Sequence, residues 1–163
     1  MPLIKDGKLA DDRFVFVPEG AAFPEDGGVM VTLDRFQSER DTLFAHHQPV
    51  AVRLASNENP DVLKDDLARI AAIAIEFPAF RDGRGFSWAR MLRTRFAYKG
   101  EIRAVGHFLY DQLAYLARVG FDAFDVRQDF RIEDFDRAMK EMRYVYQPSA
   151  DGARTIGALR AGR

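Results

Sequence analysis

Short apolar segments alternate with amphipathic segments along most of the chain, and this alternation predicts repeated strand–helix units. Compact apolar runs of about four to eight residues are typical of strands that are buried on both faces. Segments with apolar residues at three- and four-residue spacing predict the helices between them. The predicted strands are residues 29–33, 49–54, 71–77, 101–105 and 121–126, and the predicted helices begin near residues 34, 61, 87, 108 and 132.

Local signals indicate where several helices begin and end. Asp34 and Ser87 are expected to begin the helices that follow them, because short polar side chains cap helix N-termini. Gly120 is expected to end its helix in a left-handed conformation. The helix residues expected to face the core are Phe36, Leu43, Phe44, Leu63, Leu67, Ile70, Leu109, Leu113, Leu116, Phe135, Ala138, Met139 and Met142, with the last helix ending near Arg143.

Five strand–helix units in series predict an α/β fold with a mostly parallel sheet of about five strands. Right-handed crossovers join parallel neighbours, but five units are too few for a complete eight-fold barrel. The sheet is therefore expected to be open or half-barrel-like. Gly7 and the apolar run at residues 14–17 indicate a short N-terminal strand or hairpin. Residues 1–147 are expected to form a single domain, and residues 148–163, which lack an apolar pattern, a disordered tail.

The composition excludes several classes of chemistry. The 163 residues include no cysteine and carry a formal net charge of −1. Without cysteine there is no disulfide, thiolate metal site or cysteine nucleophile, and three histidines form no recognisable metal set. The near-zero charge gives no field toward nucleic acid or membranes, and neither a signal peptide nor a membrane helix is apparent. We expect a cytoplasmic protein that binds no metal, nucleic acid or membrane.

Positive charge is concentrated in one loop and the helix after it. Residues 81–87 combine two glycines with two arginines at an expected helix start, where backbone N–H groups favour an anion. The basic residues of segment 81–103 are Arg81, Arg84, Arg90, Arg93, Arg95, Lys99 and Arg103, opposed by Asp82 and Glu101, which leaves a local charge of about +5. Asp82, Gly83, Arg84, Ser87 and Arg93 are thus candidates for an anion site. Pairing of Arg84 with Asp82 or Glu76 is the structural alternative.

Two further loops carry candidate residues. Gly106 and His107 follow a predicted strand, and His107 could act as an acid or base with Asp111 four residues on. A packing or capping histidine is the alternative. Arg127 follows the last predicted strand and could reach the same end of the sheet as Arg84. Neither the dinucleotide fingerprint nor a Walker pattern occurs, so catalytic residues and cofactor stay unassigned.

Four segments in order resemble a known family. They are Asp82–Ser87, Leu92–Arg93 with Tyr98–Gly106, Asp111–Gln112 and Gly120–Phe124. Over about residues 77–127 the chain resembles the bacterial family called domain of unknown function 934. The family's characteristic positions fall on Asp82, Gly83, Arg84, Ser87, Arg93, Gly100, Glu101, Arg103, Gly106, Asp111 and Gln112. Many relatives carry Asp where this chain has His107 and Cys where it has Val119.

The resemblance implies a role in assimilatory sulfate and sulfite reduction. Members are typically encoded beside sulfite reductase genes and are labelled as oxidoreductases of sulfite reduction. Because this chain lacks cysteine and a dinucleotide fingerprint, we expect an accessory protein. It would bind an oxyanion, or a partner such as sulfite reductase or another sulfur-assimilation enzyme. Arg84, Arg93 and Ser87 would hold the anion, and Glu101 and Arg103 would orient the loop or contact the partner.

Two other readings of the same residues stay open. One is an enzyme with a barrel-like active site, in which Asp82, Arg84, Glu101 and Asp111 act on a phosphorylated or carboxylated small molecule. The other is an interaction protein in which Asp82, Arg84 and Arg103 form a purely structural network. A homo-oligomer, or a redox cofactor bound through an unfamiliar motif, is compatible with each reading.

Overall fold

One sheet organises the molecule. The computed structural model describes residues 2–142 and 144–162. The strands are β1 (Leu3–Lys5), β2 (Lys8–Ala10), β3 (Phe14–Phe16), β4 (Gly28–Thr32), β5 (Val50–Leu54), β6 (Ile70–Phe77), β7 (Glu101–Gly106) and β8 (Ala123–Asp125). The helices are α1 (Leu33–Ala45), α2 (Arg84–Thr94), α3 (Leu113–Val119), α4 (Ile132–Glu141) and α5 (Ile156–Ala161), with single 3-10 turns η1 (Pro60–Leu63) and η2 (Tyr110–Gln112). Met1, Arg143 and Arg163, which belong to the expected domain, last helix and tail, lie outside the described residues.

The α/β class and the mostly parallel sheet are confirmed, but the number of strands is not. The sheet has eight strands in the order β2-β1-β8-β7-β6-β5-β4-β3, rather than about five. Strands β3 to β8 run parallel, while β1 is antiparallel to both β8 and β2. The five expected strands are β4 to β8. The predicted short N-terminal strand or hairpin is confirmed, because β1 and β2 pair around Gly7 and β3 lies in the apolar run at residues 14–17. These three strands were not counted among the five, since each has only three residues, too few to show a hydrophobic period.

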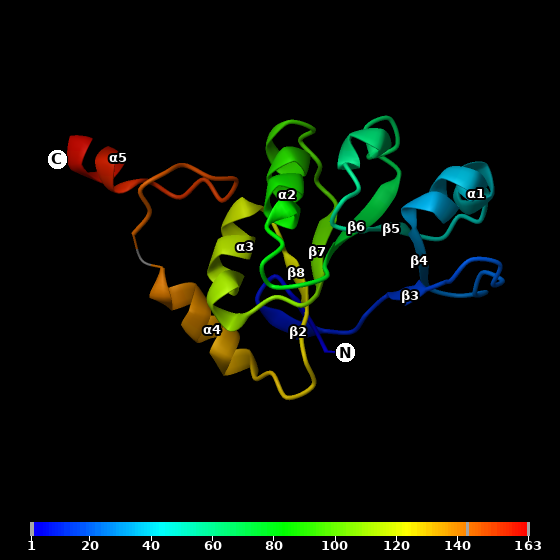
Figure 1. Ribbon diagram of the computed structural model, residues 1–163, viewed down its shortest axis with the longest axis horizontal. Coiled ribbons are helices and arrows are strands. Elements are labelled where there is room, and N and C mark those ends of the chain that lie inside the picture. Colours follow the sequence, from blue (N-terminus) through cyan, green and yellow to red (C-terminus); the bar gives the residue numbers. More distant parts are fainter. Residues whose placement is uncertain (1, 143, 163) are drawn as a thin grey trace.

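The two edges of the sheet lie close together, so the sheet is curled into a half-barrel. Strands β2 and β3 are at opposite edges, yet the three residues Asp11–Arg13 suffice to join them. A connection of this length spans at most about 15 Å. The edges of a flat eight-stranded sheet would be about 34 Å apart. Figure 1 shows the connection from β2 to β3 on the side of the sheet away from α1, α2 and α3.

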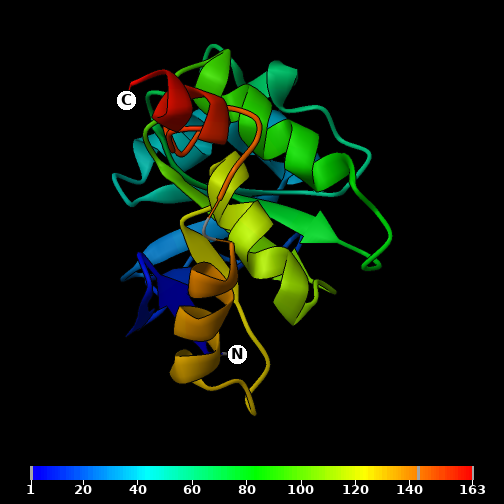
Figure 2. The same ribbon diagram turned by 90° about the vertical axis from the view of Figure 1, so that its left-hand side faces the viewer.

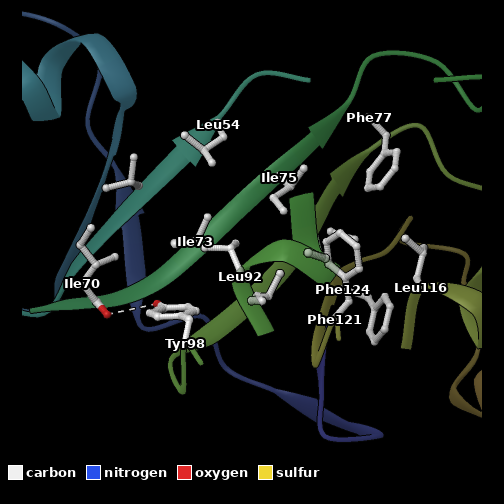
Figure 3. Close-up of a cluster of buried hydrophobic side chains, with 14 of the residues drawn as sticks. Leu54, Ile70, Ile73, Ile75, Phe77, Leu92, Tyr98, Leu116, Phe121 and Phe124 are labelled. Atoms are coloured by element: carbon white, nitrogen blue, oxygen red, sulfur yellow. Dashed lines mark hydrogen bonds between the residues drawn. The ribbon is translucent and has the colours of Figure 1, made fainter. Parts of the chain in front are cut away.

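The main core lies between the helices and the outer face of the curled sheet (Figures 1 and 2). Apolar strand residues on this face pack against apolar residues of the helices. The fully buried members include Val31, Val52, Ile73, Ile75 and Ile102 from strands, and Phe36, Leu43, Leu92, Leu113 and Leu116 from helices. Figure 3 shows this cluster, with Tyr98 Oη donating a hydrogen bond of 3.1 Å to the Ile70 carbonyl oxygen.

The first two predicted helices differ from the structure. Thr32 rather than Asp34 caps α1, since its side chain accepts a hydrogen bond from the Arg35 N–H at 3.3 Å. The helix predicted near residue 61 is wrong, because the chain makes only the 3-10 turn η1 there. Ile70 therefore begins β6 instead of facing the core from a helix. Helical spacing over so short a segment fits a turn followed by a strand equally well.

The next two predicted helices also begin elsewhere. Helix α2 begins at Arg84 rather than at Ser87, because Asp82 accepts a hydrogen bond from the Arg84 N–H at 3.2 Å and turns the chain earlier. The helix predicted from residue 108 is divided into η2 and α3. Leu109 precedes both and is exposed instead of facing the core. Gly120 ends α3 with φ of 118°, as predicted.

The C-terminal segment packs against the end of α3. Phe135 and Ala138 of α4 are buried as expected, whereas Met142 lies just beyond that helix and is exposed. In the segment expected to be a disordered tail, Arg118 Nε donates to Asp151 Oδ2 at 3.0 Å, and the short helix α5 follows. Within the described residues, no helix combines the length and apolar character needed to cross a membrane.

Candidate functional site

A groove of about 1000 Å³ opens at the carboxyl ends of β6, β7 and β8. Its walls are residues 78–80 after β6, residues 106–110 after β7 and most of residues 125–130 at the end of β8. Leu113 of α3 and Asp134 of α4 complete the lining. In parallel α/β folds, ligands bind at this end of the strands. The groove is therefore a candidate functional site.

Three of the residues singled out from the sequence line this groove: Gly106, His107 and Arg127. Gly106 has φ of 94°, and a Cβ there would lie 2.5 Å from the Phe77 carbonyl oxygen. The His107 N–H donates to that same oxygen at 2.7 Å. Glycine is needed here because both the left-handed conformation and the close approach exclude a side chain.

His107 and Arg127 do not form the arrangements proposed for them. His107 and Asp111 are both exposed, and within the described residues their side chains are not hydrogen-bonded to each other. The side chain of Arg127 is 85% exposed and pairs with Asp129 at 3.1 Å rather than reaching Arg84. In the part of the chain that the structure describes, no three His, Asp or Glu side chains form a group that could hold a metal.

Asp125 is a groove residue that the sequence analysis did not select. It ends β8, opposite Leu3 of β1, and lines the groove. Burial raises the pKa of Asp125, the Arg103 charge opposes that rise, and the Asp12 charge adds to it. Among the described residues, none donates a hydrogen bond to its side chain. Its position at the carboxyl end of a predicted strand was the available signal.

Charged side chains form a chain of ion pairs inside the half-barrel. The Arg103 side chain is 1% exposed and donates to Asp12 Oδ2 from Nη1 at 2.6 Å. Its Nη2 donates to Asp12 Oδ1 at 2.9 Å, and its Nε donates to Glu101 Oε1 at 2.9 Å. Lys5 Nζ donates to Glu101 Oε2 at 2.7 Å. We call Lys5, Glu101, Arg103 and Asp12 the interior clasp, because Asp12 lies in the connection between β2 and β3.

Pairing outweighs desolvation in the clasp. Burial disfavours the charged guanidinium, but hydrogen bonds to Asp12 and Glu101 raise the pKa of Arg103 overall. Partial burial alone would raise the pKa of Asp12. The hydrogen bonds from Arg103 and from the Phe14 N–H lower the pKa instead. Glu101 and Arg103 thus join the N-terminal connection to the sheet, and neither lies beside Asp82 or Arg84.

Arg93 is also internal. Its Nε donates to the Gly120 carbonyl oxygen at 3.0 Å, and its Nη1 donates to the carbonyl oxygens of Tyr98 and Gly100 at 2.8 and 2.7 Å. Its Nη2 donates to Asp122 Oδ2 at 2.7 Å. The guanidinium therefore ties the end of α2 to the turns before β7 and β8. These four bonds use most of the donors that the sequence analysis assigned to an anion.

Asp82 and Arg84 form a pair, as the structural alternative predicted. Arg84 Nη2 donates to Asp82 Oδ2 at 2.6 Å and to Ser56 Oγ at 2.9 Å, which links the loop after β6 to the loop after β5. Hydrogen bonds with Arg84 and Ser56 hold the pKa of Asp82 well below its usual range. Glu76 pairs with Arg53 instead. Asp82, Arg84, Glu101 and Asp111 do not share a pocket, because Glu101 lies at the amino end of β7.

The outer face of α2 carries the remaining positive charge. Arg84, Ser87 and Arg90 follow at three-residue spacing and are all exposed, so they share this face. Arg81 precedes the helix, with its guanidinium 5.4 Å from the Phe80 ring centre. Within the described residues, neither Arg81 nor Arg90 has an ion-pair partner. The local charge of about +5 in the sequence is thus divided between the interior, the turns and this face.

Gln112 fixes the two loops between the groove and α2. Its Nε2 donates to the Phe80 carbonyl oxygen at 3.0 Å, and its Oε1 accepts from the Leu109 N–H at 3.0 Å. Phe80 and Leu109 are both exposed, at 46% each. The Gln112 side chain therefore holds two large apolar residues at the surface. This structural role was not apparent from the sequence.

The geometry defines a class: a small α/β half-barrel with its helices on one face, a clasped interior and a groove at the carboxyl ends of the strands. The family model described as "Bacterial protein of unknown function (DUF934)" matches residues 51–156, which is most of the chain. The chain belongs to this family. No curated protein and no solved structure matches the chain.

Proposed function

We propose that the chain is an accessory protein of assimilatory sulfite reduction that docks onto a redox-enzyme partner. The docking surface consists of Phe80, Arg81, Arg84, Ser87 and Arg90. The observation that carries the proposal is Phe80, an exposed aromatic residue that is held in place by Gln112 and flanked by Arg81. Aromatic and arginine side chains dominate the binding energy of protein interfaces.

Docking fits the arrangement of the arginines better than capture of a small oxyanion does. A small anion needs several donors that converge within hydrogen-bonding distance. Arg93 uses its donors on carbonyl oxygens and Asp122, and Arg84 is shared between Asp82 and Ser56. Arg81, Arg84 and Arg90 are instead spread along a loop and a helix face. This spacing suits carboxylates distributed over the surface of a partner protein.

The assignment to sulfite reduction rests on the resemblance to the family. The positions that carry this resemblance include Asp82, Arg84 and Ser87 on or beside the docking surface, and Gln112 beneath it. The chain has no cysteine with which to form a thiol couple or an iron–sulfur cluster. We therefore assign electron transfer to the partner and recognition to this chain.

The test is binding to purified sulfite reductase from the same bacterium, followed by biolayer interferometry at several salt concentrations. The variant Arg81→Glu/Arg90→Glu reverses two charges that have no internal ion pair among the described residues. We expect its affinity to fall at least tenfold and its salt dependence to weaken. Lys64→Glu/Lys140→Glu makes the same change in charge outside the docking surface, and this variant is expected to bind like the native chain.

A second measurement separates docking from unspecific attraction. Phe80→Ser removes the apolar centre without changing charge, and we expect it to weaken binding while leaving the salt dependence intact. Equal affinity for the native chain and the Arg81→Glu/Arg90→Glu variant would contradict the docking surface. If the native chain neither binds sulfite reductase nor alters its turnover, the proposed place in sulfite reduction is wrong.

A further inference from the structure

We propose that the groove at the carboxyl ends of β6, β7 and β8 binds a small organic cation. The ligand would be an amine or amidine carried on a flat apolar group, and Asp125 would be its counter-ion. This site borders the docking surface and shares Phe80 with it, but Arg81, Arg84, Ser87 and Arg90 do not line the groove. The proposal does not depend on the partner.

The charges that line the groove leave one carboxylate uncompensated. Three acidic residues, Asp125, Asp129 and Asp134, face one arginine, Arg127. Asp129 pairs with Arg127 at 3.1 Å, and Asp134 pairs with Arg137 of α4 at 3.3 Å. Among the described residues, Asp125 has no such partner. A bound cation would supply the missing charge.

Three cations of the half-barrel, Arg103, Lys5 and Arg53, are already paired with other carboxylates. Arg103 is shared between Asp12 and Glu101, and Lys5 binds Glu101. Arg53 pairs with Glu76 at 3.1 Å. The three cations and the three carboxylates of these pairs balance one another in charge. The charges of Arg103 and Arg53 act on Asp125 from a distance, but among the described residues neither forms an ion pair with it.

The walls of the groove suit a flat apolar cation. Phe80, Phe108, Tyr110 and Phe130 all contribute to the lining. Aromatic rings attract cations through the negative face of their π-system, and they also cover apolar surface. Phe108 is held by edge contacts with Phe77 and Phe124, at ring-centre distances of 6.3 and 6.4 Å. A carboxylate combined with aromatic walls selects an amine or amidine over a hydrated metal ion.

An anionic ligand fits the same groove poorly. Arg127 is the one arginine in the lining, and its guanidinium is bound to Asp129. A carboxylate or phosphate entering the groove would meet Asp125 without a free arginine to offset the repulsion. The sign of the ligand's charge is therefore the property to measure.

The experiment uses three flat probes of nearly equal shape: benzamidine, benzamide and benzoate, which are cationic, neutral and anionic. Binding to the full chain is measured by isothermal titration calorimetry at pH 7. We expect benzamidine to bind saturably, benzamide to bind at least tenfold more weakly, and benzoate to bind least. Binding of benzamide or benzoate as tight as that of benzamidine overturns the proposal, and so does the absence of benzamidine binding.

Two matched variants locate the site. Asp125→Asn is expected to bring the affinity for benzamidine down to that for benzamide, while leaving benzamide binding unchanged. Asp111→Asn removes an exposed carboxylate of η2 that does not line the groove, and it is expected to keep the tenfold preference. Circular dichroism checks that both variants fold. The proposal is contradicted if the preference for benzamidine over benzamide survives Asp125→Asn, or if benzoate binds and Arg127→Ala abolishes its binding. Neither outcome bears on the proposed docking to sulfite reductase.

Discussion

The interior clasp and the floor of the groove place buried charge on the same curled sheet in opposite ways. In the clasp, Arg103 is almost completely buried, yet each of its carboxylate neighbours lies within 3 Å of it. At the groove, the carboxylate of Asp125 is partly buried and no described residue donates to it. The pKa of Arg103 is raised by pairing, whereas the pKa of Asp125 is raised by burial.

This difference separates a charge that the fold pairs from one that has no ion-pair partner among the described residues. Removing one member of a buried ion pair such as those of the clasp strongly destabilises the fold, because the other member stays buried without compensation. An unpaired carboxylate costs stability when it ionises. Side chains that cost stability persist where binding or catalysis uses them, so the contrast directs attention to Asp125 rather than to Arg103.

The largest expected effect is the loss of the clasp. Asp12→Ala leaves the Arg103 guanidinium with Glu101 alone, and we expect the free energy of unfolding to fall by about 2–3 kcal/mol. The value lies below that of a fully buried pair because the Asp12 side chain is 35% exposed. Urea unfolding at pH 7 measures it. Asp11→Ala changes the exposed neighbour and should unfold like the native chain.

The same variant has a defined pH dependence. The pKa of Asp12 is lowered in the folded chain, so its contribution is present above its unfolded pKa of about 3.9 and is lost as pH falls through the folded pKa. The difference in stability between the native chain and Asp12→Ala should therefore shrink below about pH 4. A difference that is constant from pH 7 to pH 2 would show that Asp12 acts through packing instead.

The second effect distinguishes two arginines that the sequence grouped together. Arg93→Lys keeps the charge but cannot reproduce the four hydrogen bonds of the guanidinium, and we expect a loss of about 2 kcal/mol. Arg84→Lys changes an exposed side chain and keeps a cation beside Asp82, so it should leave the melting temperature nearly unchanged. Differential scanning calorimetry of both variants measures the contrast, and equal shifts would refute it.

The smallest expected effect has the opposite sign. Because the pKa of Asp125 is raised in the folded chain, ionisation of Asp125 lowers stability as pH rises through its unfolded pKa of about 3.9 toward the folded pKa. Asp125→Asn should therefore be more stable than the native chain at pH 7, by about 0.5–1 kcal/mol after allowance for solvent screening. Below about pH 3.5 the two should unfold alike. A destabilised Asp125→Asn variant at pH 7 would mean that the carboxylate is already compensated.

The sequence predicted the elements with long apolar runs and missed those fixed by distant contacts. Ile73 and Ile75 lie in a continuous apolar run, so β6 was apparent from its composition alone. Gly7 indicated the N-terminal hairpin of β1 and β2, but the pairing of β1 with β8, more than a hundred residues later, is encoded by no local pattern. Helix α2 begins at Arg84 rather than at the predicted Ser87, because the Asp82 side chain accepts a hydrogen bond from the Arg84 N–H and turns the chain earlier.

The position of the candidate site could be predicted from the sequence, but most of the residues that line it could not. Placing it at the carboxyl ends of the strands was possible from the strand order, and Gly106, His107 and Arg127 do line the groove. The segment around Arg84, Arg93 and Arg103 looked like one basic site because sequence distance was short. Arg103 instead binds Asp12, which is 91 positions away, and Arg93 binds carbonyl oxygens that any residue type supplies.

The position of β1 between β2 and β8 has a consequence for synthesis on the ribosome. The hairpin of β1 and β2 is made before the other strands, but β8, with which β1 pairs, is the last strand of the sheet in chain order. At about 5–20 residues per second, roughly 6–25 s pass before residues 123–125 are translated. During this interval β1 lacks β8 as its neighbour, so the nascent chain completes its sheet only after residues 123–125 have left the ribosome.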